Sequence, residues 1–509
     1  MQLRTVLRNV FSNWLGYAVT IGLGFFLAPY VVGRLGTSKY GVWTLVVSLT
    51  GYFGMLDLGI RSSVGRFVAR HLARNDDQSV NRTISSAFAI LGAGGMLALI
   101  ASIILNLSFG VFKVEPSLES AARAALLISG LTIGLALPMG VFGAVLISLE
   151  RFDVMTAVSV TGALTRAALT LLVLKHGYGL VALAIITLAV GTCEYAAMAT
   201  CAKRLYRPLR LSWKLIDSAS CRELFGFGIY RFFWIVANQM IFFTDSTVIG
   251  IFLSAGAITY FAIPGSLINY GRNVVSLATD ALYPIATRLD SKDDLSGLRE
   301  LQISGTRLSL LIAVPLCLGY IFLGKQFITL WMGEQYAVSA VFLAMLAIPQ
   351  LTSMSQNTST LILAGMAKHR VLAYAVLAEG VANLALSIVL VRKMGLVGVA
   401  WGTVIPHLIT TAIFIPLYTL RTLRMSPWEY LAKAYVRPLL CAVPVATMCF
   451  GFATLIERPS WFVFGGEVAA VCGLFTILSY YICLNAVEQA SLQDKVRSLL
   501  RPKPIIYEI

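Results

Sequence analysis

Long apolar runs separated by short polar segments dominate the chain. Each run reaches about 20 residues, the length that an α-helix needs to cross the hydrocarbon core of a bilayer. Helices of soluble proteins carry polar residues on one face and do not sustain such runs. The pattern predicts an all-α polytopic membrane protein with about 14 transmembrane helices. The predicted spans are 10–32, 40–60, 84–111, 122–148, 152–174, 179–201, 224–251, 257–283, 303–324, 336–364, 371–391, 396–420, 434–456 and 462–484.

The stretch 260–283 is apolar enough to cross a bilayer yet contains many polar side chains. In a helix, positions three and four residues apart lie on one face, so these side chains would form one stripe. A charge that faces lipid costs several kcal/mol, so we expect the stripe to face a water-filled cavity or other helices. The stripe consists of Asn269, Arg272, Asn273, Ser276, Thr279, Asp280 and Tyr283, with Tyr270 beside it.

Other predicted spans carry isolated polar side chains. Arg231, Asn238 and Asp245 recur every seven residues in one span, which places them on nearly one helix face. Thr50, Gly54, Asp57 and Arg61 follow helical spacing in another. Further positions are Arg166, Glu194, Glu379, Asn383 and Asn357. A solute path between two halves of a transporter would be lined in this way.

Each of these residues has a structural interpretation as well as a functional one. Asp57 and Arg61, four residues apart, could form a local ion pair. Arg166 could pair with Glu194 or line the path. The guanidinium of Arg272 suits a phosphate or carboxylate. A carboxylate removed from water takes up protons more readily, which makes Asp245 and Asp280 the main ion-coupling candidates. Asp57 and Glu379 are further candidates for that role.

The distribution of Lys and Arg among the loops explains the net charge of +16. With the N-terminus inside, alternate loops on the inner side hold 28 of the 40 Lys and Arg residues, and the opposite loops hold 9. This is the positive-inside pattern, which predicts that both termini of this multi-pass protein lie in the cytoplasm. The basicity is explained by topology, and we expect no nucleic-acid partner.

A weak internal repeat suggests how the spans are grouped. Trp14 and Trp234, Gly36 and Gly256, and Tyr40 and Tyr260 match at an offset of 220 residues, and the loops 70–77 and 288–294 are alike. Parallel repeats in transporters enclose a central cavity. The repeat predicts two six-helix lobes around a central cavity and an added C-terminal helix pair. The predicted ranges are 1–201 for the N-lobe, 202–223 for a basic amphipathic linker, 224–420 for the C-lobe and 421–509 for the last two spans and the tail.

The linker 202–223 is basic and contains Trp213. One interpretation places it on the inner membrane surface, attracted to anionic lipid. The other treats it as a tether between the lobes.

Motifs for catalysis are missing from the sequence. It contains no P-loop, no His/Glu zinc spacing and no Gly-x-Ser-x-Gly elbow. The eight cysteines form no Cys-x-x-Cys pair, and the four histidines are scattered. We therefore expect no enzyme activity, no cofactor and no metal site. Transport would have to use the gradient of the substrate or of an ion such as Na⁺ or H⁺.

The segment 9–73 resembles a known family. The residues that carry the likeness are Leu35-Gly36, Tyr40-Gly41-Val42-Trp43, Leu56-Asp57-Leu58-Gly59 and the basic run 66–74. They are similar to those of the bacterial polysaccharide biosynthesis proteins, the oligosaccharide flippases of the multidrug/oligosaccharidyl-lipid/polysaccharide exporter superfamily.

The resemblance implies a function and site residues. Such a protein moves an undecaprenyl-diphosphate-linked oligosaccharide across the inner membrane by alternating access, for exopolysaccharide, capsule or O-antigen assembly. The family's arginine-lined cavity is matched here by Arg272, and less closely by Arg166 and Arg231. Asn269, Asn273, Tyr270, Tyr283 and Asn238 are the candidates to contact the sugar.

Two alternatives stay open at this point. One is a cation-coupled drug or metabolite antiporter of the same superfamily, in which acidic side chains would carry the mechanism. The other is a non-transporting membrane scaffold for a glycosyltransferase complex.

Overall fold

The computed structural model describes residues 3–456, 459–484, 489 and 493. For residues 3–15, 227–231, 234 and 369, only the backbone is described. All regular elements in this part of the chain are helical. Ten helical segments are long and apolar enough to cross a membrane. The predicted all-α, multi-pass membrane class is therefore confirmed.

The ten segments account for most of the fourteen predicted spans. The segments Gly16–Leu72 and Arg370–Leu423, of 57 and 54 residues, each contain two predicted spans. The predicted spans 257–283 and 336–364 are not among the ten. The first coincides with helix α8 (Ala255–Thr279), whose polar stripe lowers its hydropathy. The second is divided at Gln356 between α12 (Ser339–Ser355) and α13 (Asn357–Gly365).

The chain packs into two compact units. Unit 1 contains residues 1–270 and 368–410, and unit 2 contains residues 271–367 and 411–509. This division differs from the lobes suggested by the repeat, because the helix α14 (His369–Leu408) packs extensively against α7 (Ser218–Phe252). The lobe ranges 1–201 and 224–420 stay a prediction.

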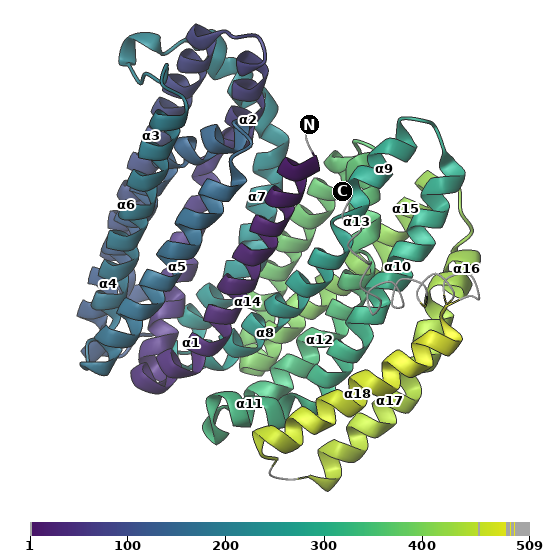
Figure 1. Ribbon diagram of the computed structural model, residues 1–509. Coiled ribbons are helices and arrows are strands. Elements are labelled where there is room, and N and C mark those ends of the chain that lie inside the picture. Colours follow the sequence, from purple (N-terminus) through teal and green to yellow (C-terminus); the bar gives the residue numbers. More distant parts are fainter. Residues whose placement is uncertain (1–2, 457–458, 485–488, 490–492, 494–509) are drawn as a thin grey trace, which may run out of the picture. The chain divides into compact units, whose positions relative to one another are not determined.

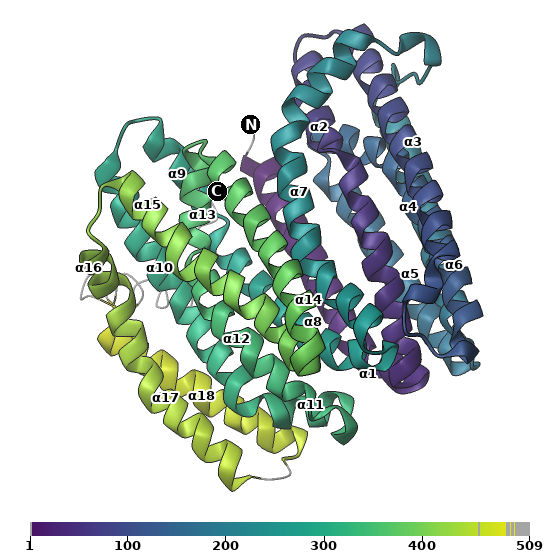
Figure 2. The same cartoon turned by 180° about the vertical axis from the view of Figure 1, so that it is seen from behind.

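Unit 1 is a bundle of long helices. The helices α3, α4 and α6 lie side by side, and α5 packs between α6 and α1 (Figures 1 and 2). The elements are α1 (Leu3–Gly51), η1 (Tyr52–Asp57), α2 (Ile60–Leu72), α3 (Asp77–Leu107), η2 (Phe109–Val111), α4 (Pro116–Ser148), α5 (Phe152–Lys175), α6 (Leu180–Leu205), η3 (Trp213–Leu215), α7, most of α8, and α14.

Unit 2 holds the remaining helices, with α17 and α18 forming the paired C-terminal helices at its edge (Figure 1). That pair corresponds to the two appended spans of the prediction. The elements are the end of α8, α9 (Leu282–Asp290), α10 (Leu295–Leu318), η4 (Gly319–Leu323), α11 (Gly324–Met332), η5 (Glu334–Tyr336), α12, α13, most of η6 (Ile409–Phe414), α15 (Ile415–Leu423), α16 (Pro427–Tyr430), η7 (Leu431–Tyr435), α17 (Val436–Leu455) and α18 (Trp461–Ile482).

Glycines in the left-handed region interrupt two of the long helical runs. Gly36 in α1 has φ 76° and ψ 170°, and Gly395 in α14 has φ 58° and ψ −134°. Residues with a Cβ avoid such conformations, whereas glycine adopts them readily. Each glycine lies between two predicted spans, so each long run consists of two limbs.

The polar stripe of the predicted span 40–60 is also divided. Leu58 and Gly59 have φ of 53° and 74°, so the 3₁₀ helix η1 ends at Asp57 and α2 begins at Ile60. Arg61 therefore belongs to a different helix from Thr50 and Gly54. The expected single helical stripe is wrong there, because two successive left-handed residues interrupt the helix.

The repeated loops share one local structure. In the first loop, Asn75 has φ 53° and Asp76 caps α3 by accepting a hydrogen bond from the Ser79 backbone N–H at 3.0 Å. In the second, Asp293 has φ 52° and Asp294 caps α10 by accepting one from the Gly297 N–H at 2.8 Å. The loop similarity seen in the sequence thus corresponds to equivalent turns before α3 and α10.

The linker between α6 and α7 is fixed along α3. Asn81 donates to the Pro208 carbonyl and accepts from the Arg210 N–H, both at 2.9 Å. Ser86 Oγ accepts from the Asp217 N–H at 3.0 Å. Because its backbone is paired with α3 side chains, the linker is a structured part of unit 1.

Candidate functional site

The two limbs of α14 place polar side chains opposite each other on either side of Gly395. Glu379 and Asn383 are four residues apart on the first limb, and Thr403 and His407 are four apart on the second. Hydrogen bonds join Asn383 to Thr403 and Glu379 to His407. The limbs are therefore antiparallel, with one polar pair on each of two successive turns.

Helix α7 adds a carboxylate to this pair of limbs. The Thr403 Oγ1 lies 3.0 Å from Asp245 Oδ1 and 2.9 Å from Oδ2, and donates to the carboxylate. The Asn383 Nδ2 donates to the same Thr403 oxygen at 3.0 Å. Asp245 is 8% exposed, and Asn383 is 2% exposed. We name Asp245, Glu379, Asn383, Thr403 and His407 the α7–α14 polar cluster.

Glu379 and His407 form the second pair of the cluster, one helical turn away from the pair Asn383 and Thr403. His407 Nδ1 lies 2.7 Å from Glu379 Oε1, and the two side chains are 15% and 5% exposed. Neither residue has the long side chain that could carry its charge to the membrane surface.

Several oxygen atoms converge near Asp245. The Val399 carbonyl lies 3.2 Å from Thr403 Oγ1, and within the described chain Asn383 Oδ1 is buried without a hydrogen bond. Carboxylate, hydroxyl, amide and carbonyl oxygens are the donors that hard cations prefer. Among the described residues, no group of three or more His, Cys, Asp or Glu side chains is arranged so that it could hold a metal ion.

The structure brings together two of the predicted ion-coupling residues, Asp245 and Glu379, and the predicted stripe residue Asn383. Thr403 and His407 were missed by the sequence interpretation. Their spacing of four residues, equal to that of Glu379 and Asn383, is the signal that could have identified them. The equal spacing indicates a pairing of these residues only because the chain reverses its direction at Gly395.

Asp57 and Arg61 form the local ion pair considered from the sequence. Arg61 Nε lies 2.9 Å from Asp57 Oδ2, and Arg61 Nη2 donates to the Ala136 carbonyl at 2.8 Å. The Asp57 side chain is 14% exposed and the Arg61 side chain 38%. The pair therefore connects η1 and α2 to α4, which is a structural contribution.

Arg166 and Glu194 also pair. Arg166 Nη2 lies 3.1 Å from Glu194 Oε1, between α5 and α6. Gly162 leaves the space for this carboxylate, since a Cβ there would lie 1.7 Å from Glu194 Oε1. Of the two alternatives for Arg166, pairing with Glu194 is observed. The Arg166 side chain is still 38% exposed, so a second contact is sterically open.

The polar stripe of 260–283 lies partly on α8. The boundary between the units falls after Tyr270, so Asn269 and Tyr270 belong to unit 1 and Arg272 and Asn273 to unit 2. All four are half-buried. The helix ends at Thr279, so the expectation that Asp280 and Tyr283 continue the same helical stripe is wrong. A turn at 280–281 places Tyr283 on α9, and both side chains are exposed.

Individual stripe residues contact other helices of their own unit. The Tyr270 ring packs edge-on against Phe25 of α1, with 6.3 Å between centroids. Thr279 Oγ1 accepts a hydrogen bond from Asn357 Nδ2 at 2.6 Å, which joins two predicted polar positions. Asn238 is half-buried on α7. The side chains of Arg231, Trp14 and Trp234 lie outside the described part of the structure.

The sequence is similar to those of known bacterial membrane proteins. The family model "Polysaccharide biosynthesis protein" matches residues 6–290. The membrane protein EpsK of Bacillus subtilis (strain 168) is 24% identical over 473 residues, which cover 89% of this chain and 90% of EpsK. A protein named as an O-antigen transporter of Shigella flexneri is 22% identical over 426 residues, covering 82% of this chain and 98% of that protein.

Solved structures of two transporter types share the fold. An inward closed structure of the lipid II flippase MurJ matches with a TM-score of 0.72 at 15% identity, covering 98% of this chain and 100% of MurJ. An inward-facing multidrug resistance MATE family transporter matches with a TM-score of 0.66 at 12% identity, covering 80% and 94%. At these identities the likeness shows the fold alone. It confirms the predicted fold class.

Proposed function

We propose, on the premise that the chain belongs to the polysaccharide biosynthesis protein family, that it is a flippase for a lipid-linked oligosaccharide. Its substrate would be an undecaprenyl-diphosphate-linked oligosaccharide, moved across the bacterial inner membrane by alternating access. The product would enter exopolysaccharide, capsule or O-antigen assembly. The protein would be a transporter without enzyme activity, with both termini in the cytoplasm.

The α7–α14 polar cluster is the observation that carries the transport part of this proposal. Placing an ionisable side chain at the centre of a membrane helix costs about 2.5–3.5 kcal/mol. Asp245, Glu379 and His407 are held deep between apolar helices, where simple packing would be served better by apolar residues. Such groups are characteristic of proteins that move ions or charged solutes.

The substrate class is supported by the relatives. A protein named as an O-antigen transporter aligns along 82% of this chain, and a lipid II flippase shares its fold. A lipid-linked oligosaccharide has a diphosphate, an isoprenoid tail and sugar hydroxyls. A flippase therefore needs a cation for the diphosphate and neutral polar side chains for the sugar.

We assign the cation to Arg272, with Arg166 and Arg231 as further candidates. Arg272 is half-buried in the middle of the polar stretch, and Asn273 follows it directly. A guanidinium can donate two parallel hydrogen bonds to one phosphate. Asn269, Asn273, Tyr270, Tyr283 and Asn238 would contact the sugar.

The assignment of Arg272 is tested by two substitutions. Arg272→Ala should reduce polymer export about 5–150-fold, the range of an interaction worth 1–3 kcal/mol. Arg272→Lys keeps the positive charge but loses the planar guanidinium that donates two parallel hydrogen bonds, so this variant should retain part of the wild-type export. Export is measured as surface polysaccharide at matched protein level. Unimpaired export by the alanine variant would overturn the assignment.

Ion coupling is assigned to Asp245, together with its oxygen neighbours Asn383 and Thr403. Na⁺ or H⁺ would bind at this carboxylate in one state of the transport cycle and leave in the other. Glu379, linked to His407, would tune the same site. Asp280 and Asp57 remain weaker candidates, because Asp280 is exposed and Asp57 is paired with Arg61.

A drug or metabolite antiporter is the second candidate function. The MATE-like fold and the buried acids favour it. It predicts that Asp245 is essential while Arg272 is dispensable. Efflux of a cytotoxic dye from cells that lack their own pumps separates the two functions, because a flippase should not accelerate that efflux.

Membrane partners follow from the same proposal. The substrate would be made on the inner face and polymerised on the outer face, so a polysaccharide polymerase or glycosyltransferase complex is the expected partner. Membrane lipids surround the exposed apolar helix faces, such as Phe462 at 92% and Leu455 at 83% exposure.

A further inference from the structure

The linker between α6 and α7 exposes a basic surface that the proposed transport function does not use. Its segment 203–216 contains Lys and Arg residues but no Asp or Glu. All of these cations are exposed, and none of them forms an ion pair with a carboxylate of the described chain. The cations are Lys203, Arg204, Arg207, Arg210 and Lys214.

The nearest acid along the chain has another role. Asp217 caps α7, where its carboxylate accepts from the Ala219 and Ser220 N–H groups at 3.3 Å and 3.0 Å. Its oxygens are therefore directed at the beginning of a helix and not at the cations of the segment.

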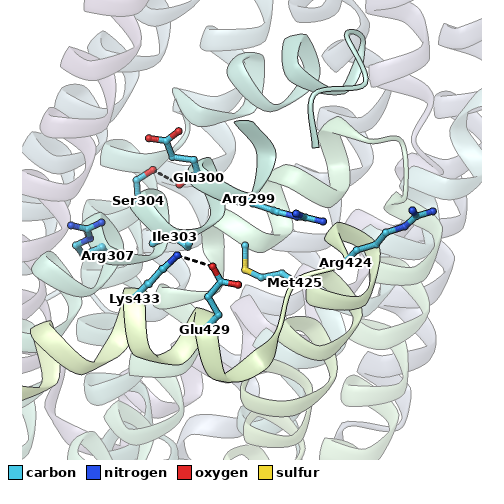
Figure 3. A pocket seen from close by; sticks show the side chains of 9 residues that line it. All are labelled: Arg299, Glu300, Ile303, Ser304, Arg307, Arg424, Met425, Glu429 and Lys433. Carbon is cyan, nitrogen blue, oxygen red and sulfur yellow. Dashed lines mark hydrogen bonds and ion pairs between the residues drawn. The ribbon is translucent and has the colours of Figure 1, made fainter. Parts of the chain in front are cut away.

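Cations in unit 2 are arranged differently. Lys433 Nζ lies 2.7 Å from Glu429 Oε1, and Glu300 lines the same hollow from α10 (Figure 3). Cations and carboxylates lie side by side in that hollow, whereas the segment 203–216 carries cations alone. An external anion would therefore meet positive charge at the linker without a competing carboxylate from the same segment.

Apolar side chains lie among the cations of the linker. Trp213 is 78% exposed, and Leu211 and Ile216 are 42% and 37% exposed. Together with Phe88 of α3 they line a hollow of about 100 Å³. Exposed aromatic and aliphatic side chains next to cations are typical of segments that lie in the headgroup region of a membrane.

Hydrogen bonds fix the depth of this surface relative to α3. The linker is bonded to α3 from Asn81 to Ser86, and within this stretch the Ser212 N–H donates to Ser85 Oγ at 3.3 Å. Directly after Ser86, the sequence of α3 becomes apolar. Trp213 follows Ser212, so it lies near the level at which α3 would enter the hydrocarbon, where tryptophan is enriched.

We propose that the segment 203–216 binds anionic phospholipid headgroups of the inner leaflet, with Trp213 inserted among them. The cations contact the phosphates, and the tryptophan with its apolar neighbours reaches the boundary of the acyl chains. Because hydrogen bonds already hold the segment on α3, little ordering is needed on binding. The site is separate from the transported substrate and does not depend on the proposed function.

Quenching of Trp213 fluorescence tests the insertion. The full-length protein in detergent micelles is titrated with phosphatidylglycerol or with the neutral phosphatidylcholine, each carrying brominated acyl chains that quench tryptophan. The chain contains 8 tryptophans, so the Trp213 signal is the difference between wild type and Trp213→Phe. We expect phosphatidylglycerol to quench this signal at a lower concentration than phosphatidylcholine does, and added salt to raise that concentration.

Charge substitutions test the contact with the headgroups. Arg207→Gln combined with Lys214→Gln should raise the half-quenching concentration of phosphatidylglycerol about 25-fold, since each cation near an anionic surface contributes about fivefold. Arg207→Lys combined with Lys214→Arg keeps both charges and should leave this concentration unchanged. The matched control is Arg288→Gln with Lys292→Gln, two exposed cations of unit 2, which should also leave it unchanged. Each variant is compared with its own Trp213→Phe counterpart.

Three results would overturn the proposal. A Trp213 signal that neither lipid quenches would place this surface in water, as docking to a protein partner requires. Equal half-quenching concentrations for the two lipids would show insertion without recognition of the anionic headgroup. A shift of the same size in the Arg288 and Lys292 control would show that the net charge of the protein, and not this segment, attracts the lipid.

Discussion

The carboxyl group of Asp245 on α7 has polar neighbours on α14. Thr403 donates to it, and Asn383 donates in turn to Thr403. A threonine hydroxyl has a single hydrogen to donate, although the Val399 carbonyl is also within 3.2 Å. A cation at this carboxylate would turn these oxygens from hydrogen-bond partners into ligands.

Replacement of Asp245 tests its coupling role. Asp245→Asn keeps the shape and can accept from Thr403, but it cannot bind a proton or neutralise a cation. We expect export to fall about 5–150-fold, the usual range of a coupling free energy of 1–3 kcal/mol. Surface polysaccharide at matched protein level is the measurement.

The matched control for Asp245 is another buried acid. Glu467 in α18 is 3% exposed and lies outside the α7–α14 polar cluster. Glu467→Gln should leave export unchanged. Full export by Asp245→Asn, at any sodium concentration and pH, would contradict the coupling role.

Single residues could be predicted where composition alone makes them unusual. Asp245, Glu379 and Asn383 were identifiable because a charge or amide is rare within an apolar span. Thr403 and His407 were missed, because threonine is common in membrane helices and their four-residue spacing gains meaning only when it is matched with that of Glu379 and Asn383. Only the antiparallel limbs of α14 give them partners.

At the scale of elements, glycine contacts determine how closely helices approach. The conspicuous Tyr40-Gly41-Val42-Trp43 segment of α1 illustrates this. A Cβ at Gly41 would lie 1.8 Å from the Ala255 carbonyl oxygen at the start of α8. Because that atom belongs to the backbone, a side chain at position 41 would push the two helices apart.

Substitution of Gly41 should therefore destabilise unit 1. We expect Gly41→Ala to cost about 1–3 kcal/mol, as overpacking of tight interiors does. The measurement is the thermal unfolding midpoint of the purified protein in detergent. Gly33→Ala on the same helix is the control, since no atom lies within 4 Å of the Cβ position. Equal midpoints for both variants would show that the contact is not tight.

The aspartate caps give three helices a defined beginning. Asp76 caps α3, Asp217 caps α7 and Asp294 caps α10. Hydrogen bonds from the Ser79 hydroxyl and N–H lower the pKa of Asp76. Those from the Ser220 N–H and hydroxyl lower the pKa of Asp217. Ser296 and the Gly297 N–H lower that of Asp294.

A lowered pKa has a direct consequence for stability. The cap at Asp76 contributes fully above the ordinary aspartate pKa of 3.8, and its contribution is lost as pH falls through the lower folded-state value. Asp76→Asn still accepts the Ser79 N–H but does not titrate. The difference in unfolding midpoint between wild type and Asp76→Asn should therefore shrink as the pH falls from 6 to 3. A difference in unfolding midpoint that stays constant over this pH range would show that protonation of Asp76 does not affect the stability of the cap.

Helix positions could be predicted from apolar length, but their interruptions could not. The fourteen predicted runs coincide with helical segments. Three interruptions lie inside apolar runs from which one continuous helix was predicted. They are at Leu58–Gly59, at Gln356 and at 280–281. A membrane helix can end wherever neighbouring groups satisfy its backbone, so hydropathy does not mark these points.

At the scale of the whole molecule, packing and sequence repeat divide the chain differently. The repeat groups spans in the order of the chain, whereas α14 leaves its sequence neighbours and packs on α7 in unit 1. Three chain crossings connect the units, at 270/271, 367/368 and 410/411. Sequence order alone could not have predicted this exchange, because it depends on which helix faces match.

The family, the fold and the α7–α14 polar cluster together support a lipid-linked oligosaccharide flippase. Such a flippase keeps ionisable groups within apolar helices, which costs free energy. An ion bound at Asp245 would set the direction of substrate transport. The arginine of the α8 stripe would supply the contact to the diphosphate. Each of these roles concerns a different step of one transport cycle, so loss of any one should stop the same lipid intermediate at the same leaflet.

The direct measurement is the leaflet position of that intermediate in cells that lack the protein. Spheroplasts are treated with a membrane-impermeant glycosidase or lectin that reaches only the outer leaflet. We predict that the lipid-linked oligosaccharide accumulates in a protected, inner-leaflet pool, and that wild-type protein, but not Asp245→Asn, restores its outer exposure. An intermediate that is equally accessible with and without the protein would contradict the flippase function.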